Sequence, residues 1–188
     1  MLKSLLVVFV LIIILYLFFT DWNYTYSKGS CGKKFLVSKQ LNTNVASDIF
    51  CELNSRTKKF IQCLKQKYGS DNLYVSRLET YYTENDLRES TETFTLNKGD
   101  KIHICIRHPK TGEFFDINTL MFVLIHELAH IADPLYYEND DHPDSFWKIN
   151  IQLLQDAEEC GIYQNINYME HPVEYCHIII NSNPLLLN

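Results

Sequence analysis

Two histidines and a glutamate, His126, Glu127 and His130, form the pattern His-Glu-x-x-His. If this stretch is helical, residues four apart lie on one face, so the two imidazoles can bind one zinc ion. Glu127 then lies about 100° around the helix axis, beside the open coordination position of the metal. The pattern therefore predicts a catalytic zinc site in which Glu127 is the general base for a zinc-bound water.

A catalytic zinc needs three protein ligands, and the third must come from elsewhere in the chain. His142 is the preferred candidate, because the twelve residues from His130 to His142 let the chain leave the helix and turn back. Asp133 is better placed to orient a histidine ligand through a hydrogen bond. The rival ligands are Asp133, Glu158, Glu159, His171 and His177.

The predicted helix around the motif is apolar nearly all round. Between positions 120 and 131 every residue outside the motif's three polar side chains is apolar. Burying two histidines and a carboxylate without partners is costly, and metal coordination offsets that cost. A surface helix with two solvated histidines is the simplest alternative, but it does not fit this composition. A purely structural zinc is a second alternative, and it has no use for Glu127.

The other elements are predicted from periodicity and turn residues. Residues 91–96 and 101–107 alternate around a turn at 97–100 and predict a β-hairpin, with His103 on its solvent side. Helices are predicted at 43–68, ending at Gly69, and from His142 to Cys160, while Asp133-Pro134 ends the motif helix. Residues 75–82 predict a short strand, 83–90 a loop and 177–180 a β-like run. These elements predict an α+β domain.

The amino-terminal residues predict a membrane anchor. Leu5 to Phe19 is an apolar run that approaches the roughly 20 residues needed to span a bilayer. We expect a transmembrane signal-anchor at 1–22, a juxtamembrane tether at 23–42 and the catalytic domain at 43–188. A cleaved signal peptide is the alternative, but small residues lie only well beyond the run. Lysines after the run weakly favour a cytosolic carboxyl side, and the opposite orientation stays open.

Composition narrows the class of protein further. The chain has 188 residues, of which 46% are hydrophobic and 13% aromatic, and this suits a globular domain. Its net charge of -6 gives no support for binding to nucleic acid or anionic membranes. Six widely spaced cysteines contain no Cys-x-x-Cys pair. They permit three disulfides, and scattered reduced thiols are an equal alternative.

The spacing of the motifs resembles a known family. His126-Glu-Leu-Ala-His130, followed by His142-Pro-Asp-Ser-Phe146-Trp147, is similar to the WLM and SprT-like zinc metallopeptidases. Residues 94–175 also resemble membrane-anchored metallopeptidases of large DNA viruses. The metzincin pattern is absent, because Asp133 stands where its glycine would be.

The resemblance implies a zincin-like fold, with a small sheet or hairpin packed on the active-site helix, and peptide-bond hydrolysis with Zn²⁺. Protein or peptide substrates, a single-pass membrane location on a host or virion membrane, and no nucleic-acid partner are the matching expectations. An oxyanion donor is also expected, with Tyr136, Tyr137, Tyr168, His171 and Tyr175 as open candidates. The alternative function is a zinc-stabilised membrane scaffold that binds a partner without cleaving it.

Overall fold

The motif helix α4 lies at the centre of the protein in the computed structural model, which describes Phe9 and residues 23–83, 87–96, 99, 101–135 and 142–186. Helix α4 spans Ile117–Ala132. It begins at Asp116, whose side chain accepts hydrogen bonds from the backbone N–H groups of Asn118 and Thr119, as expected for an N-cap. It ends at Asp133, before Pro134, as the sequence predicts.

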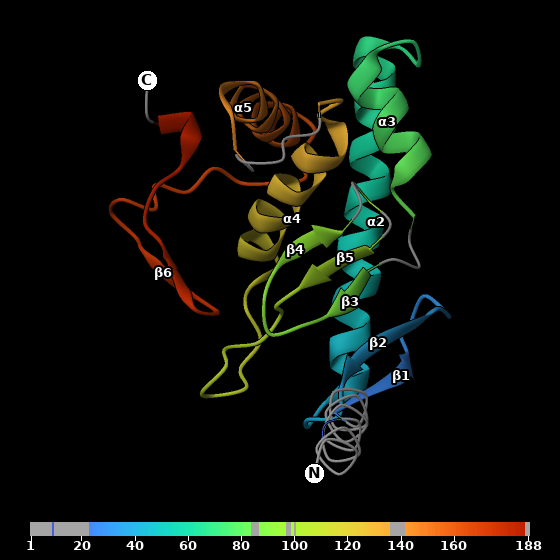
Figure 1. Cartoon of the computed structure of the whole chain (residues 1–188), viewed down its shortest axis with the longest axis vertical. Coiled ribbons are helices and arrows are strands. Elements are labelled where there is room, and N and C mark those ends of the chain that lie inside the picture. The colour runs from blue at the N-terminus through green and yellow to red at the C-terminus, as the bar shows by residue number, and fades with distance from the viewer. Residues whose placement is uncertain are drawn as a thin grey trace.

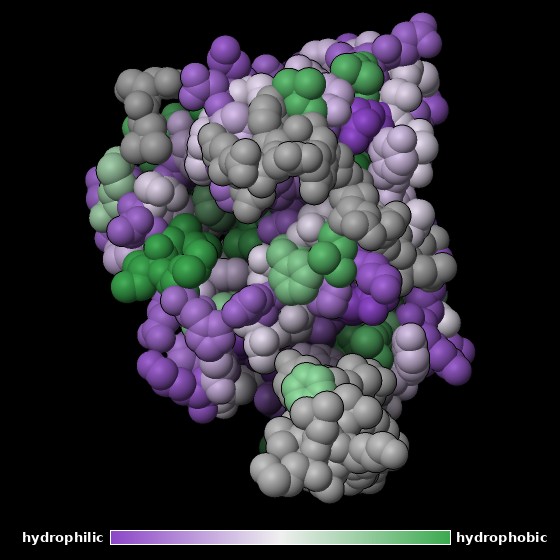
Figure 2. Space-filling view, in the orientation of Figure 1, coloured by the Kyte–Doolittle hydropathy of each residue, from purple (hydrophilic) through white to green (hydrophobic). Residues whose placement is uncertain are grey.

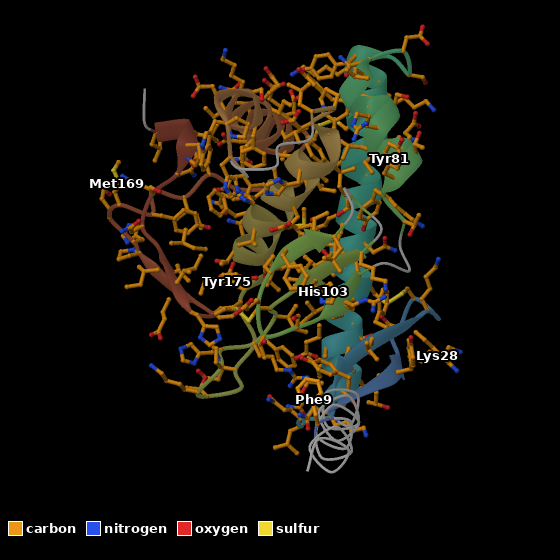
Figure 3. All side chains as sticks on the ribbon, in the orientation of Figure 1. Phe9, Lys28, Tyr81, His103, Met169 and Tyr175 are labelled. Carbon is orange, nitrogen blue, oxygen red and sulfur yellow. A yellow bond between two sulfur atoms is a disulfide. The ribbon has the colours of Figure 1, made fainter. Side chains whose placement is uncertain are left out.

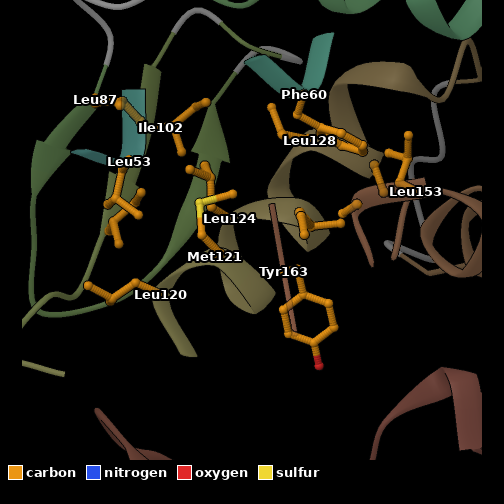
Figure 4. Packing of buried hydrophobic residues seen from close by; sticks show 14 of the residues in the cluster. Leu53, Phe60, Leu87, Ile102, Leu120, Met121, Leu124, Leu128, Leu153 and Tyr163 are labelled. Atoms are coloured by element: carbon orange, nitrogen blue, oxygen red, sulfur yellow. The ribbon is translucent and has the colours of Figure 1, made fainter. Parts of the chain in front are cut away.

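Helix α4 is buried on several sides. Leu120, Leu124 and Leu128 are fully buried and pack in one core with Phe60 and Ile102 (Figure 4). Phe60 belongs to the long helix α2, Thr43–Tyr68, which runs without interruption and ends at Gly69 with a positive φ of 81°. Because these apolar side chains are buried and closely packed, α4 is held rigidly, and the side chains of the motif start from a fixed backbone.

A five-stranded mixed sheet lies in front of α2 and α4 in Figure 1. Its strands are β1 Tyr24–Lys28, β2 Lys34–Ser38, β3 Leu87–Glu89, β4 Phe94–Leu96 and β5 Lys101–Ile104, in the spatial order β1-β2-β3-β5-β4. Strands β4 and β5 pair antiparallel, which confirms the predicted hairpin, whereas β3 is parallel to both β2 and β5. Strand β4 therefore forms one edge of the sheet, and this is the edge nearest the motif.

The remaining elements surround α4. Helix α3 spans Leu73–Tyr81, and α5 spans Asp144–Glu159, where the second helix was expected. A separate two-stranded hairpin is formed by β6, Val173–Tyr175, and β7, Ile178–Ile180, followed by a short 3₁₀ helix at Pro184–Leu186. Figure 1 shows this hairpin across a gap from α4 and β4, with α5 above it. The α+β class is confirmed, and the sheet is larger than the single hairpin that was predicted.

Three local predictions were wrong. Residues 75–82 form most of α3 and not a strand, because the Asn72 side chain caps a helix by accepting from the N–H groups of Tyr74 and Val75. The expected loop at 83–90 contains β3. The expected tether contributes β1 and β2 to the sheet, since Phe35 and Val37 alternate with more exposed residues and are buried. The first error came from a missed local cap, and the other two came from strands whose pairing partners are distant in the sequence.

The predicted membrane anchor at 1–22 lies outside the described residues, apart from Phe9, which is helical and exposed. Within the described ranges, no helix combines the length and the apolar character that a bilayer crossing requires. The membrane segment therefore stays a prediction.

All six cysteines form disulfides. Cys31–Cys51 joins the β1–β2 turn to α2, and Cys63–Cys160 joins α2 to the end of α5. Cys105–Cys176 joins the residue after β5 to the turn of the β6–β7 hairpin. The third of these links is the one that holds two walls of the candidate site together.

Candidate metal centre and cleft

The structure brings together three histidines from two elements. His126 and His130 lie one turn apart on α4, and His142 lies just before the start of α5. Their candidate ligand atoms all lie within 4.8 Å of one another, and the Nε2 atoms of His126 and His142 are 3.0 Å apart. Among the residues that the structure describes, no other group of three such side chains meets this condition.

This arrangement fits a zinc ion. Zn–N bonds of 2.0–2.1 Å at tetrahedral angles bring two nitrogen ligands to about 3.3 Å from each other, close to the His126–His142 separation. Three imidazoles offer nitrogen donors and leave one position of a tetrahedron for another group. The donor set and its spacing therefore suit a catalytic type of site better than a closed structural one.

One aromatic side chain supports all three histidines. The ring of Phe146, on the first turn of α5, lies 4.9 Å from that of His126, 4.4 Å from His130 and 4.7 Å from His142, measured between ring centres. Phe146 is buried, so it excludes water from that side of the cluster. Trp147 adds a second ring near His142, at 5.6 Å. The aromatic pair that follows His142 thus has a positioning role.

Burial governs the protonation of the site. Burial, with the charges of His130 and His142, lowers the pKa of His126 to about 3. Burial also raises the pKa of Glu127 to about 7, against a smaller opposing effect of a hydrogen bond from Thr95. Neutral imidazole is the form that binds a metal, so His126 is ready for coordination across the physiological range. A glutamate with a pKa near neutrality suits proton transfer.

The edge of the sheet contacts the base directly. Thr95, the middle residue of β4, donates a hydrogen bond of 2.6 Å from its hydroxyl to Oε2 of Glu127. This contact holds the carboxylate between α4 and the edge strand. The sequence prediction missed Thr95, although it did place the hairpin next to the motif helix.

A cleft of about 380 Å³ opens beside His126 and Glu127. Its opposite wall is the β6–β7 hairpin, which includes Tyr175 (Figure 3). The Tyr175 hydroxyl lies 2.7 Å from the hydroxyl of Thr93, which itself accepts a hydrogen bond from the N–H of Cys105. These contacts, with the Cys105–Cys176 disulfide, fix the hairpin against the sheet.

Among the described residues, none of the rival third ligands belongs to the three-histidine cluster. Asp133 is buried and accepts a hydrogen bond from the N–H of Leu135, while Glu159 pairs with Lys67. Glu158, His171 and His177 are exposed, and of these only His177 lines the cleft.

His103 lies outside the cluster, on the face of β5 opposite to the buried Ile102 and Ile104. It is half-buried and stacks on Phe94, with ring centres 4.4 Å apart. Burial, with the positive charges of Arg88 and Lys101, lowers its pKa to about 4. The prediction that His103 is not a ligand agrees with this position, although the side chain is less exposed than expected.

The structure distinguishes among the candidate oxyanion donors. Tyr136 and Tyr137 lie outside the described residues. Tyr168 is fully buried and His171 is exposed, and neither lines the cleft, whereas Tyr175 does. Other residues that line the cleft were missed, namely Glu92, Thr93, Phe122, Val123, Cys176, Ile178 and Ile180. Phe122 and Val123 could have been found, since they precede His126 by one helical turn. The predicted β-like run at 177–180 is confirmed by β7, but nothing in the sequence placed it beside the motif helix.

Two histidines on the buried helix α4, a third just before α5 and a glutamate held by an edge strand define a candidate metal-binding protein. The WLM domain family model matches residues 77–171, which contain the whole cluster. The chain belongs to this family, a SprT-like metalloprotease family.

The relatives come from large DNA viruses. An uncharacterized protein of Acanthamoeba polyphaga mimivirus is 32% identical over 161 residues, which cover 81% of this chain and 80% of the relative. An uncharacterized protein of Invertebrate iridescent virus 3 is 43% identical over 75 residues, 40% of this chain and 44% of the relative. A protein of Invertebrate iridescent virus 6 is 38% identical over 80 residues, 41% of this chain and 42% of the relative. No solved structure matches the chain.

Proposed function

We propose that the protein is a zinc-dependent peptidase that hydrolyses peptide bonds with Glu127 as general base. The observation that carries the proposal is the position of Glu127, which lies in a cleft beside the three-histidine cluster and is held by Thr95 of the edge strand. His126, His130 and His142 would hold the metal. When bound there, zinc supplies Lewis acidity, which polarises a scissile carbonyl and lowers the pKa of water.

Glu127 would move the proton. Thr95 donates to Oε2, so we assign the proton transfer to Oε1. The carboxylate accepts a proton from the attacking water and later delivers it to the leaving amine. A pKa near 7 supports both steps, because the group can gain and lose a proton at neutral pH.

Tyr175 is the best candidate for the oxyanion donor. Its hydroxyl lies beside Thr93, whose oxygen already accepts from the N–H of Cys105. If Thr93 donates its own hydrogen to Tyr175, the phenolic hydrogen is left to point into the cleft. A donor fixed in this way stabilises developing negative charge without reorganisation.

An extended peptide would lie along β4. This strand is the sheet edge nearest Glu127, and edge strands present backbone N–H and C=O groups to an added strand. Such pairing would align a peptide between β4 and the β6–β7 hairpin.

The test compares the wild-type chain with Glu127→Gln, using zinc content and cleavage of denatured proteins. We expect one zinc per chain in both proteins and a loss of hydrolysis by about 10²–10⁴-fold in the variant, the usual contribution of a general base. Cleavage that persists in Glu127→Gln would contradict the proposal. Zinc binding without any cleavage by the wild type would favour the scaffold function.

The location of the protein is also a proposal. Three disulfides favour an oxidising compartment for the domain, whereas the lysine distribution favours a cytosolic one. The disulfides are the stronger argument, because they involve every cysteine of the chain. A single-pass anchor at 1–22 would then place the domain that follows it, with β1 and β2 included, on the non-cytosolic side.

A further inference from the structure

The cleft beside Glu127 has an apolar half that the hydrolysis of a peptide bond does not by itself require. Phe122 and Val123 of α4 form one wall, and Ile178 and Ile180 of β7 form the other. We propose that these four residues form a subsite for a large apolar side chain of the substrate, next to the bond that is cleaved. This inference rests on the proposed peptidase function and specifies its substrate class.

The position along α4 sets how close the subsite is to the reacting bond. Phe122 and Val123 precede His126 by four and three residues, which corresponds to about 4.5–6 Å along the helix axis. One residue of an extended peptide spans about 3.4 Å. A side chain in the subsite therefore belongs to a residue within one or two positions of the cleaved bond.

The strand period explains which isoleucines face the cleft. Ile178 and Ile180 are two residues apart on β7 and line the cleft, whereas Ile179 between them does not. Ile178 is nevertheless 62% exposed and Ile179 is 64% exposed. Figure 2 shows hydrophobic surface on the left, where Figure 1 has the hairpin. Ile178 thus presents apolar surface inside the cleft that a substrate side chain would cover.

Charge disfavours an acidic side chain in this subsite. Glu92 lies at the edge of the cleft and Glu127 at its catalytic end. His177 also lines the cleft, but a substrate carboxylate placed among the four apolar side chains would lose its water and be repelled by both glutamates. We therefore expect the order leucine or phenylalanine, then alanine, then aspartate.

The subsite is already formed before a substrate arrives. The Cys105–Cys176 disulfide fixes the turn between β6 and β7, and the contact between Tyr175 and Thr93 fixes the end of β6. At about 380 Å³ the cleft is at the lower end of the roughly 300–1,000 Å³ of small-ligand sites. This size suits side chains of an extended peptide rather than a folded surface.

Binding is measured first, with the full chain carrying Glu127→Gln, loaded with zinc, and labelled eight-residue peptides. Two peptide series vary one position to leucine, alanine or aspartate, on either side of the central bond. The series that varies the residue facing the subsite should show the preference. In that series we expect the leucine peptide to bind about ten-fold more tightly than the alanine peptide, because leucine fills the apolar pocket. Equal affinities in both series would overturn the subsite, whether or not the wild type cleaves.

The matched variants are Ile178→Ala and Ile179→Ala, both in the Glu127→Gln chain. Ile178→Ala should reduce the ratio of leucine to alanine affinity by about five-fold, because part of the apolar wall is removed. Ile179→Ala removes an equally exposed side chain outside the cleft and should leave the ratio unchanged. An equal effect of the two variants would overturn the assignment.

Hydrolysis by the chain with its native Glu127 separates the two proposals. Cleavage that depends on Glu127 but shows no preference in either series would overturn the subsite and keep the peptidase. Selective binding without Glu127-dependent cleavage would keep the subsite and overturn the peptidase.

Discussion

The two walls of the cleft are held in place by different kinds of contact. On the metal side, His126 and His130 are four residues apart on one helix, and His142 follows His130 by only twelve residues. On the hairpin side, Tyr175 depends on a hydrogen bond to Thr93, 82 residues earlier. The disulfide of that wall joins cysteines 71 residues apart.

This difference separates the chemistry from the selection of substrate. Residues proposed to bind metal and move protons come from the buried helix α4 and from His142, which precedes α5. Two of the four residues proposed to select a side chain come from a hairpin that reaches the cleft through distant contacts, and the other two come from α4. Changes to the metal ligands or Glu127 should therefore abolish reaction, whereas changes to Ile178, Ile180 or the disulfide of the hairpin should alter which peptides react and how stable that wall is.

The largest effect is expected for His142→Ala. Loss of one of three nitrogen ligands should weaken zinc binding by more than about 100-fold, the upper range for loss of an outer hydrogen bond to a ligand. Activity should be lost with the metal. Competition with a chelator measures the affinity.

His171→Ala is the matched control, because His171 is an exposed histidine outside the cluster. It should bind zinc as the wild type does. Normal zinc binding by His142→Ala, with loss in His171→Ala, would transfer the third-ligand role and break the metal side of the comparison.

Removal of one disulfide should affect the hairpin wall alone. In Cys105→Ala/Cys176→Ala, we expect zinc content to persist while the preference for apolar peptides declines. The hairpin should also open at a lower denaturant concentration, since a native disulfide typically contributes about 2–5 kcal/mol. Peptide selectivity and hydrogen exchange of β6 and β7 measure the two effects.

Cys63→Ala/Cys160→Ala provides the comparison, because this disulfide joins α2 to the end of α5, away from the cleft residues. It should lower the free energy of unfolding by a similar amount and leave peptide selectivity unchanged. If both pairs altered selectivity equally, the hairpin would have no separate role.

The same contrast explains which features the sequence predicts. The motif helix, α2, α5 and the β4–β5 hairpin each carry a local signal of period or turn residues, and each is present. The cluster of His126, His130 and His142 follows from one motif and one short connection. Strands β1 and β2 carried no such signal, and the β-like run that becomes β7 carried none for its place beside the cleft, because both positions exist only after distant segments meet. Thr95 illustrates the limit, since a strand residue acquires its role from a helix 32 positions later.

The smallest predicted effect is that of Thr95, through which the edge strand β4 contacts Glu127 of α4. Burial raises the pKa of Glu127, and the hydrogen bond from Thr95 opposes this by favouring the carboxylate. Thr95→Val removes the donor, so the pKa of Glu127 should rise further. Because a base must be deprotonated, the acid limb of the kcat/KM profile should move to higher pH. A hydrogen bond to a charged group is worth about 1.5 kcal/mol, which corresponds to roughly one pH unit. Thr95→Ser keeps a hydroxyl and should retain the wild-type limb; a shift to lower pH in Thr95→Val would mean that the edge strand does not tune the base.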